Sequence, residues 1–405
     1  MPRLNTRDAA IEEALTRSVA AIYPDRSALR SALRSGRKLT IYVGIDPTAP
    51  YVHIGHSTNY LVLERFQKLG HRIVVLVGDF TAMIGDPSDK KSARQPLTRD
   101  EVRHNLATFK EQIGKVLDFK NAENPVAFKF NSEWLSKLTF EDVIGLASNF
   151  TVQQMLERDM FEKRIAEGKP LFVHEFFYPL MQGYDSVAMD VDLEIGGTDQ
   201  TFNMLAGRTL VERYKQREKF VLTTTLLVNP ATGEKMMSKS LGTGIGLNEP
   251  PAEMFGKTMA LPDEGIIQTF IDCTRLSLPE IDAKRRRLVD GENPKTLKLE
   301  LAHELVRMYH GAAAATAARA GWEAAFSERR IPDSLPQIKV KKGSPLIDTI
   351  VANGFAPSKT AARRLFTDGA IHNLETDKRI NDPTATVNAP LVLKIGKKHF
   401  VRIVV

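Results

Sequence analysis

A strand, a turn, a helix and a second strand follow one another near the N-terminal end of the chain. Residues 38–45 are rich in β-branched side chains, and the turn 46–48 comes directly after them. The apolar spacing predicts a helix at 55–69, and the run at 72–77 predicts a second strand. This order is the βαβ unit of a doubly wound parallel sheet, in which ligands bind at the carboxyl ends of the strands.

The rest of the chain first extends this pattern and then leaves it. A further strand is predicted at 126–130, helical segments at 134–168 form an insertion, and the sheet resumes near 193–195. The spacing of apolar residues at 8–35 predicts helix before the sheet, and the pattern at 250–325 is helical throughout. The chain is therefore predicted to be an α/β protein with a helical domain after the sheet.

The last part of the chain has a different pattern. Three prolines and three lysines mark 330–345 as a linker. Beyond it, Ser358 can cap a helix that ends at Gly369, and short strands are expected out to Val405. The predicted domains are an N-terminal helical segment at 1–38, a Rossmann-like domain at 39–249 with an insertion at about 131–175, a helical domain at 250–335, a linker at 336–345 and a small α+β domain at 346–405.

Length and composition exclude several classes of protein. With 405 residues, 42% hydrophobic and 26% charged, the chain has the composition of a globular protein of two or three domains. Its single cysteine, Cys273, permits no internal disulfide, and neither a signal peptide nor an apolar run of about 18 residues is present. We therefore expect a soluble, cytoplasmic protein with no membrane partner.

The excess positive charge lies at the C-terminal end. Residues 337–405 hold 12 Lys and Arg against 5 Asp and Glu, whereas residues 1–336 hold 44 of each kind. A basic end on a neutral body indicates a body that handles a small molecule and an end that binds a polyanion, most simply a nucleic acid. A solubilising basic surface is the alternative.

Two histidines stand at the start of the first predicted helix, in the sequence His53-Ile-Gly-His56. A helix N-terminus offers N–H groups and a positive dipole to a phosphate, and Gly55 lets a nucleotide approach the backbone closely. His53 and His56 can then donate hydrogen bonds to phosphate oxygens and stabilise charge in a transition state. The alternatives are a metal-binding pair or two solvated histidines. Because no third ligand stands at a suitable spacing, no metal site is predicted.

A second candidate is the glycine-flanked loop 233–242, which carries Lys235, Ser238 and Lys239. The loop can close over a polyphosphate, and its ammonium groups can neutralise a departing pyrophosphate. Taken alone, such a segment could equally be a surface loop. The combination with His-Ile-Gly-His in one chain is far more specific than either motif, and no GxxxxGK[ST] or GxGxxG loop competes with it.

These two motifs resemble the signatures of the class I aminoacyl-tRNA synthetases. Other stretches are similar to the tyrosyl-tRNA synthetases of bacterial type, and the helix after Ser358 resembles that of an S4-type RNA-binding domain. The similar stretches are Tyr42-Val-Gly-Ile-Asp-Pro-Thr-Ala-Pro50, Gly78-Asp-Phe-Thr-Ala-Met-Ile-Gly-Asp-Pro87, Tyr178-Pro-Leu-Met-Gln-Gly-Tyr-Asp185 and Ile195-Gly-Gly-Thr-Asp-Gln200. The resemblance covers nearly the whole chain, and its motifs fall in the family's order. It implies a helical anticodon-binding domain at 250–335 and a homodimer with the insertion at the interface.

The resemblance also implies a site for tyrosine. Tyr42 and Asp185 match the positions that hydrogen-bond the phenol, and a pocket built for a hydroxyl rejects phenylalanine because its own polar groups would stay unpaired. The residues that match the sites for the ammonium and carboxylate groups are Asp86, Tyr178, Gln182 and Gln200. Singly, each could be a core or turn residue; as a set in the family's order they indicate a substrate site.

A second set of residues is implied for the nucleotide. The residues that match the ATP site are Asp46, Gly55, Gly197, Asp199, Lys235, Ser238 and Lys239, with Asp199 accepting from ribose hydroxyls. The catalytic residues implied are Thr48, His53, His56 and Lys239. The family's second signature is often Lys-Met-Ser-Lys-Ser, whereas here the five residues that end at Ser240 begin with Met236, so Lys235 stands one place earlier.

The activity that the resemblance implies is tyrosine activation by ATP with Mg²⁺, followed by transfer to tRNA(Tyr), with no protein-bound metal or organic cofactor. The RNA-binding residues implied in the last domain are Lys359, Arg363 and Arg364. A tryptophanyl enzyme shares the fold, but Tyr42, the motif at Asp185 and the S4-like end speak against it. A catalytically inactive RNA-binding protein would not need His53, His56 and Lys239. A nucleotidyltransferase for small metabolites would leave the basic end unexplained.

Overall fold

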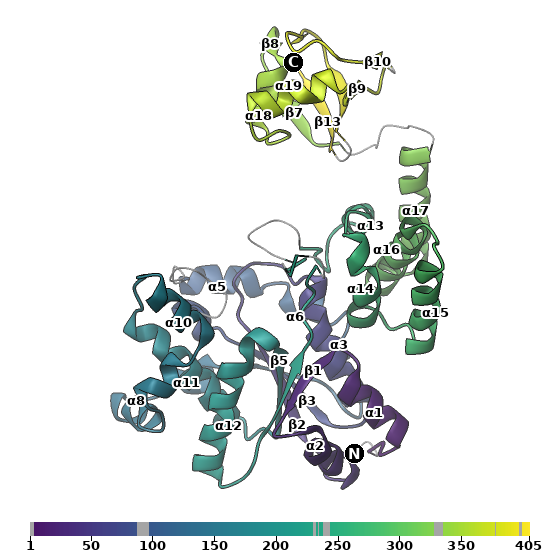
Figure 1. Cartoon of the computed structure of the whole chain (residues 1–405). Coiled ribbons are helices and arrows are strands. Elements are labelled where there is room, and N and C mark those ends of the chain that lie inside the picture. Colours follow the sequence, from purple (N-terminus) through teal and green to yellow (C-terminus); the bar gives the residue numbers. More distant parts are fainter. Residues whose placement is uncertain are drawn as a thin grey trace. The chain divides into compact units, whose positions relative to one another are not determined.

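The computed structural model describes residues 4–86, 97–229, 232–233, 235–237, 244–327, 335–376, 378–396 and 399–405. The chain divides into two compact units, Met1–Ala315 and Thr316–Val405 (Figure 1). Within the described residues, the first unit contains a six-stranded sheet, and the second contains a five-stranded and a two-stranded sheet.

The first sheet has the strand order β1-β6-β5-β2-β3-β4. Its strands are β1 (Val19–Tyr23), β2 (Thr40–Ile45), β3 (Arg72–Val77), β4 (Ala127–Phe130), β5 (Leu193–Gly197) and β6 (Phe220–Thr224). The strands from β6 to β4 are all parallel. The chain runs outward from β2 to β3 and β4 and then returns to β5 on the other side of β2. The predicted doubly wound sheet is confirmed, with its switch point between β2 and β5, where such sheets bind ligands.

The N-terminal segment differs from the helix predicted at 8–35 and from the helical segment predicted at 1–38. It contains α1 (Asp8–Thr16), then β1, then α2 (Arg26–Arg34). Ser18 adopts a positive φ of 61°, which ends the helical path before β1. The β-branched and aromatic residues of β1 pair antiparallel with β6, so long-range main-chain hydrogen bonds outweigh the local helical spacing.

Helices cover both faces of this sheet. Those that pack on it or precede the insertion are α3 (Ile54–Lys68), α4 (Thr81–Ile84), α5 (Arg99–Leu106), α6 (Phe109–Ile113), α11 (Val173–Ala188) and α12 (Thr201–Lys215). The crossovers through α3 and α12 run in opposite directions along the sheet, which places these helices on opposite faces (Figure 1). A Cβ added to Gly183 of α11 would lie 2.8 Å from Leu210 Cδ1 of α12, so the small residue permits the close packing of these two helices.

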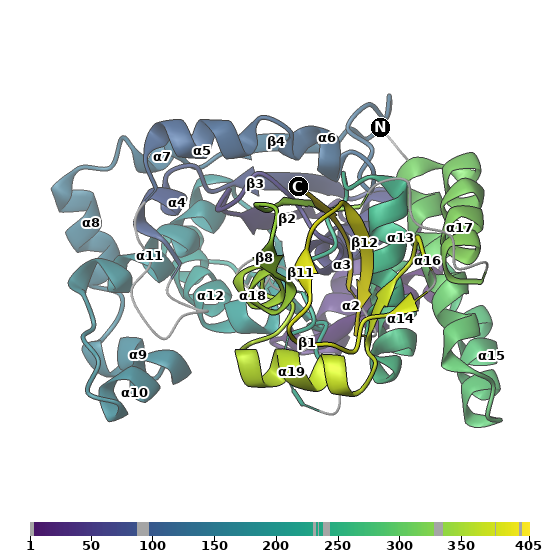
Figure 2. The ribbon, with the colours of Figure 1, turned by 90° about the horizontal axis from the view of Figure 1, so that it is seen from above.

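The predicted insertion consists of short helices joined by turns. It contains α7 (Ser132–Leu135), α8 (Phe140–Ala147), α9 (Val152–Leu156) and α10 (Asp159–Ala166). Figure 2 shows α8, α9 and α10 together at one end of the first unit. Each of α8 and α9 begins with a capping box, in which a threonine side chain and the residue three places later exchange hydrogen bonds with the backbone.

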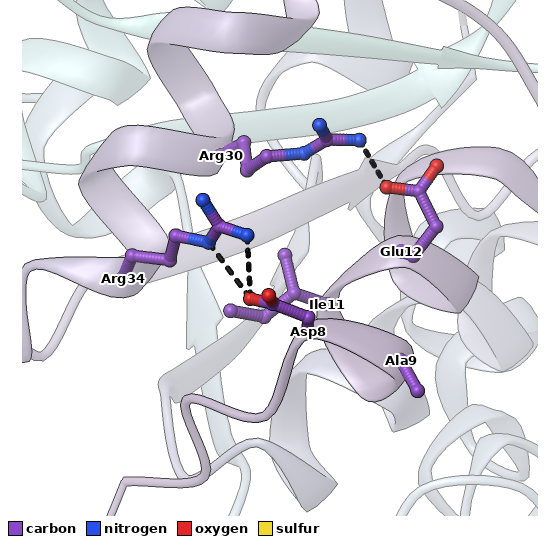
Figure 3. Close-up of a pocket in the computed structure, with 6 residues that line it drawn as sticks. All are labelled: Asp8, Ala9, Ile11, Glu12, Arg30 and Arg34. Atoms are coloured by element: carbon purple, nitrogen blue, oxygen red, sulfur yellow. Dashed lines mark hydrogen bonds and ion pairs between the residues drawn. The ribbon is translucent and has the colours of Figure 1, made fainter.

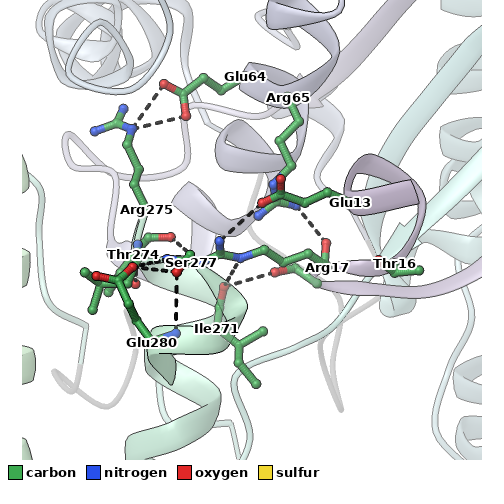
Figure 4. A network of polar contacts seen from close by, with 12 residues as sticks. Glu13, Thr16, Arg17, Glu64, Arg65, Ile271, Thr274, Arg275, Ser277 and Glu280 are labelled. Atoms are coloured by element: carbon green, nitrogen blue, oxygen red, sulfur yellow. Dashed lines mark hydrogen bonds and ion pairs between the residues drawn. The ribbon is translucent and has the colours of Figure 1, made fainter. Parts of the chain in front are cut away.

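A helical segment follows the sheet, as predicted from the pattern at 250–325. Its members are α13 (Pro251–Met259), the 3₁₀ turn η2 (Asp263–Gly265), α14 (Ile266–Cys273), α15 (Leu278–Val289), α16 (Pro294–His310) and α17 (Ala312–Ser327). A polar network ties this segment to the N-terminal segment and to α3 (Figure 4). Arg17 is buried and donates to the carbonyls of Ile271 and Thr274 at 3.1 and 2.8 Å, and Arg65 of α3 donates to the carbonyl of Arg17 at 2.7 Å. The end of α14 is thereby fixed against the helix that carries the two histidines.

The second unit is an α+β fold built on its own core. Its elements after α17 are β7 (Gln337–Lys339), β8 (Ser344–Pro345), α18 (Leu346–Ala352), α19 (Lys359–Thr367), β9 (Ile371–Asn373), β10 (Lys378–Arg379), β11 (Thr386–Val387), β12 (Leu391–Ile395) and β13 (His399–Val404). Ile350 and Phe366 of the two helices pack with Leu393 and Val401 of the sheet. Ser358 caps α19 as predicted, accepting from the N–H of Ala361 at 3.2 Å.

The linker predicted at 336–345 is not free of structure. Its β7 pairs parallel with β13 and forms an edge of the five-stranded sheet. The three prolines indicate a linker, but the main-chain N–H and C=O groups of residues 337–339 form hydrogen bonds within the sheet. Among the helices in the described ranges, none is long and apolar enough to cross a membrane.

Candidate active site

The two histidines lie at the N-terminus of α3, where β2 leads into the helix. Nδ1 of His53 accepts from the N–H of His56 at 3.3 Å, and Nδ1 of His56 accepts from the N–H of His53 at 3.2 Å. Because each Nδ1 is an acceptor, the proton of each neutral imidazole lies on Nε2. The pair therefore caps its own helix and has a defined tautomer, with Nε2–H as the side-chain donor.

The described ends of the second motif lie against the same helix terminus. The N–H of Ile54 donates to the carbonyl of Ile245 at 2.9 Å, and the N–H of Leu247 donates to the carbonyl of Val52 at 2.8 Å. On the other side of the motif, a Cβ added to Gly55 would lie 3.2 Å from Cβ of Met237. The chain thus joins both ends of the loop to the His-Ile-Gly-His segment. Ser238 and Lys239 lie outside the described residues.

Lys235, which precedes those residues, lies beside another candidate nucleotide residue. Its Nζ is 3.0 Å from Oδ2 of Asp199, in the 3₁₀ turn η1 (Thr198–Gln200) that follows β5. Gly197 ends β5, and a Cβ there would lie 2.6 Å from Oδ1 of Asp199. The glycine therefore makes room for the aspartate side chain, and three predicted nucleotide residues lie together.

Asp46 joins the nucleotide set to the tyrosine set. One of its oxygens accepts from Tyr178 Oη and the other from Thr81 Oγ1, both at 2.8 Å. A Cβ at Gly78 would lie 2.0 Å from Oδ1 of Asp46, so only glycine permits this approach. Burial, together with the charge of Asp46, raises the pKa of Tyr178 well above its ordinary value, which keeps its hydroxyl a donor. Thr48 lies close by in the chain and donates its N–H to the carbonyl of Asp46 at 2.9 Å.

The two residues predicted to read the phenol are both buried, and each has its own partner. Tyr42 Oη lies 3.0 Å from Ser186 Oγ. Asp185 accepts from Trp134 Nε1 at 2.7 Å and from Asn131 Nδ2 at 3.3 Å. Burial raises the pKa of Asp185 well above that of an ordinary aspartate, and these two donors oppose the rise. The buried carboxyl group is thus held in a fixed orientation.

Of the candidate ammonium and carboxylate residues, Asp86 and Gln200 contact each other. Its Oδ2 accepts from Gln200 Nε2 at 2.7 Å, and its Oδ1 accepts from Arg158 Nη2 at 3.2 Å. Asn203 donates to Gln200 Oε1 at 3.0 Å and fixes that amide. Gln182 does not take part in this cluster and donates to Glu194 instead, at 2.9 Å.

Several residues at the site had not been predicted from the sequence. They are Thr81, Asn131, Trp134, Arg158, Ser186, Glu194, Asn203 and Lys219. Asn131, Trp134 and Arg158 belong to the region predicted as an insertion, so that region contributes contacts to the candidate tyrosine residues Asp185 and Asp86. For Glu194 a signal existed, because a carboxylate stands within the apolar run of a predicted strand and buried charges need a partner.

The candidate RNA-binding residues lie on α19 of the second unit. Arg363 and Arg364 are exposed, and Lys359 forms an ion pair with Asp348 at 2.6 Å. In the part of the chain that the structure describes, no group of three or more His, Cys, Asp and Glu side chains is placed to hold a metal ion.

A separate surface pocket between α1 and α2 has a structural explanation. Arg34 contacts Asp8 at 2.6 Å, and Arg30 pairs with Glu12 (Figure 3). The charged groups that line the pocket thus pair with one another across it. They hold the two N-terminal helices together, and none of them is a candidate site residue.

The fold and the site define a class of protein that comparison with known families identifies. Residues 34–327 match the family model described as tRNA synthetases class I (W and Y), and the chain belongs to this family. The tyrosine–tRNA ligase of Moorella thermoacetica is 43% identical over 396 residues, which is 96% of this chain and 94% of that protein. Tyrosine–tRNA ligase 2 of Vibrio parahaemolyticus is 42% identical over 400 residues, covering 98% of this chain and 100% of that protein.

Solved structures share the fold at lower identity. A C-terminally truncated mitochondrial tyrosyl-tRNA synthetase of Aspergillus nidulans superposes with a TM-score of 0.66 at 23% identity, covering 79% of this chain and 95% of that one. The tyrosyl-tRNA synthetase of Archaeoglobus fulgidus, complexed with L-tyrosine, gives 0.59 at 22% identity, with coverage of 77% and 99%.

Proposed function

We propose that this chain is a tyrosine–tRNA ligase, which activates L-tyrosine with ATP and transfers it to tRNA(Tyr). The observation that carries the proposal is the buried pair Tyr42 and Asp185, with Trp134 and Asn131 orienting the carboxyl group. A buried polar pair of this kind binds a phenol more tightly than a phenyl ring, because the pocket groups stay unpaired when the hydroxyl is missing. Relatives of the same activity at over 40% identity across nearly the full chain support it.

In the proposed first step, the tyrosine carboxylate attacks the α-phosphate of ATP in line, and pyrophosphate leaves with Mg²⁺. No protein group becomes covalently attached. His53 and His56 donate from Nε2–H to phosphate oxygens, and Lys239 neutralises the leaving group. Positioning and charge stabilisation then supply most of the acceleration, as in other phosphoryl-group reactions. In the second step, a hydroxyl of the 3′-terminal ribose of tRNA attacks the tyrosyl carbonyl, and AMP leaves.

The tyrosine ammonium group is proposed to bind at Asp86. There it shares the carboxylate with Arg158 and Gln200, and Tyr178 lies on the Asp46 side of the same region. Asp199 accepts from the ribose of ATP, and its contact with Lys235 places an ammonium group beside the nucleotide. Asp46, which Tyr178 and Thr81 hold, connects the two substrate sites.

A homodimer through the insertion is part of the proposal. Large apolar side chains on this region are exposed, with Phe140 at 81% and Val173 at 73%. Ile144, Val152, Ile165 and Phe172 are further exposed apolar residues of the same region. Such a concentration is typical of a surface that another protein covers. Because Trp134 and Arg158 also come from this region, a second copy would support the tyrosine pocket.

We propose that tRNA binds partly through the second unit. Arg363 and Arg364 are exposed on α19, and the last 69 residues hold the chain's net positive charge. The proposed compartment is the cytoplasm, where tRNA and ATP are both available.

The proposal is tested by charging tRNA with each of three labelled amino acids. The purified protein is incubated with ATP, Mg²⁺, bacterial tRNA and tyrosine, tryptophan or phenylalanine, and acid-precipitable label is counted. Label from tyrosine alone is expected. Label from tryptophan would assign the chain to the other branch of its family, and no label with any of them would favour a catalytically inactive RNA-binding protein.

A further inference from the structure

A buried ion pair lies behind the candidate tyrosine pocket. Glu194 of β5 is 2% exposed and forms an ion pair with Lys219, which is fully buried just before β6. Lys219 Nζ also donates to the carbonyl of Met204 at 3.2 Å. A Cβ at Gly207 of α12 would lie 2.5 Å from Lys219 Nζ, so the glycine makes room for the ammonium group.

The carboxylate of Glu194 reaches two candidate substrate residues. Its Oε1 accepts from Gln182 Nε2 at 2.9 Å. Its Oε2 accepts from Ser186 Oγ at 3.4 Å, and Ser186 Oγ lies 3.0 Å from Tyr42 Oη. One buried carboxylate therefore contacts Gln182 directly and Tyr42 through a single serine.

A stabilising role alone does not account for this pair. Removing two charges from water costs about as much as their attraction returns, and apolar residues of the same volume often stabilise a protein equally well. Burial lowers the pKa of Lys219, and the charge of Glu194 opposes this fall, so Lys219 depends on its partner to remain charged. Unlike an apolar pair, the charged pair forms hydrogen bonds in fixed directions. These bonds link it to Gln182 and, through Ser186, to Tyr42.

We propose that Glu194 and Lys219 are positioning residues for tyrosine. The carboxylate orients the amide of Gln182 at the aminoacyl end of the substrate and, through Ser186, holds the hydroxyl of Tyr42 at the phenol end. Lys219 pairs with Glu194 and holds its carboxylate in place. This inference rests on the proposed function and extends it to residues that do not themselves contact substrate.

The network has two arms, from Glu194 to Gln182 and from Glu194 through Ser186 to Tyr42, and substitutions can test them separately. Ser186→Ala cuts only the arm to Tyr42, whereas Glu194→Gln combined with Lys219→Met removes both arms and leaves no buried charge unpaired. A matched control is Glu175→Gln combined with Arg164→Met, which removes an equally buried ion pair whose other partners are Pro170 and Phe172. The assay is ATP–pyrophosphate exchange, with KM for tyrosine and ATP, and with phenylalanine as a competitive inhibitor.

Ser186→Ala is expected to raise KM for tyrosine about tenfold, the effect of one hydrogen bond, without changing KM for ATP or the Ki of phenylalanine. The Glu194/Lys219 double variant is expected to raise KM for tyrosine further and also to raise the Ki of phenylalanine, because Gln182 serves both ligands. The control pair is expected to leave these constants unchanged.

Unaltered KM and Ki in both test variants, with a lowered melting temperature only, would overturn the inference and make the pair structural. If the double variant does not fold, Ser186→Ala decides the matter alone, because it removes no charge. A wild-type protein that shows no exchange with tyrosine would overturn the proposed function and this inference together. Exchange by the wild type with unaltered variants overturns only the inference.

Discussion

The imidazole rings of His53 and His56 stack at the N-terminus of α3, with their centroids 3.6 Å apart and their planes inclined by 17°. Each ring also accepts from the backbone N–H of the other residue. These contacts fix both rings before a substrate arrives, which is the arrangement that electrostatic stabilisation of a transition state requires. The helix cap and the proposed catalytic donors are thus the same two side chains.

His56→Ala is expected to slow formation of the adenylate by about 10² while leaving tyrosine binding nearly unchanged, because the donor acts on phosphate in the transition state. Single-turnover pyrophosphate release and equilibrium tyrosine binding measure the two effects separately. His104→Ala, an exposed histidine on α5, serves as the control. Equal losses in rate and in tyrosine affinity would contradict the assigned role.

Trp134→Phe removes the indole N–H that donates to Asp185 at 2.7 Å. The expected result is a KM for tyrosine raised about tenfold, since the buried carboxyl loses one of its two orienting hydrogen bonds. The Ki of phenylalanine should not change, because this ligand has no phenol to place. Trp322→Phe, at the chain's other tryptophan, is the matched control. A rise in both constants would mean that Trp134 shapes the pocket rather than the polar contact.

His71 predicts a pH dependence of stability. Its Nδ1 accepts from the N–H of Leu39 at 3.2 Å, and burial lowers its pKa to about 4. Between pH 6.5 and 4 the unfolded chain binds a proton at this site and the folded chain does not, so stability is lost as pH falls through this window. The expected loss from pH 7 to pH 4.5 is about 2 to 3 kcal/mol of unfolding free energy.

Urea unfolding at the two pH values measures this loss, and His71→Gln provides the comparison. The variant is less stable at pH 7, but its own decrease toward pH 4.5 should be smaller by the amount that His71 contributes. The same decrease in both proteins would show that other groups cause the acid sensitivity.

Phe140→Asp combined with Val173→Asp is expected to convert a dimer into a monomer, because two exposed apolar side chains of the proposed interface become charged. Light scattering during size-exclusion chromatography gives the mass directly. Val289→Asp changes an equally exposed valine on α15 and should leave the mass unaltered. A wild-type protein that is monomeric at assay concentration would remove this part of the proposal.

Arg363→Ala combined with Arg364→Ala is expected to weaken tRNA binding and to reduce the slope of log K against log salt by about 1 to 2, if each side chain meets one phosphate. Filter binding at several salt concentrations gives the slope. Arg103→Ala, at an exposed arginine of the first unit, tests for a general effect of lost charge. An unchanged slope would return the basic end to a solubilising role.

Local patterns were sufficient to predict most of the sheet. The strands at 38–45 and 72–77 and the helix at 55–69 were predicted because apolar periodicity and turn residues agree there. The first strand was missed because Val19 to Tyr23 gains its stability from β6, about 200 residues later in the chain, and local spacing carries no information about that partner. β7 was missed for the same reason, because it pairs with the distant β13 and the nearby prolines indicate a linker.

In the candidate site, too, local contacts could be predicted from the sequence and long-range contacts could not. His53, His56 and the residues around Asp46 belong to contiguous motifs, so their neighbourhood follows from the chain itself. Asp185 accepts hydrogen bonds from Asn131 and Trp134, which lie more than 50 residues earlier in the chain, and Glu194 pairs with Lys219. These contacts depend on which strands and helices become neighbours in space, and that arrangement is known only once the sheet order is known.

ATP–pyrophosphate exchange by the purified protein, with tyrosine, tryptophan and phenylalanine supplied in turn, decides whether the pocket reads the phenol. We expect exchange with tyrosine alone and its loss in Asp185→Ala, because the buried carboxyl group is proposed to bind the phenol. Exchange with phenylalanine at a rate comparable to that with tyrosine, or exchange with tyrosine that survives Asp185→Ala unchanged, would contradict it.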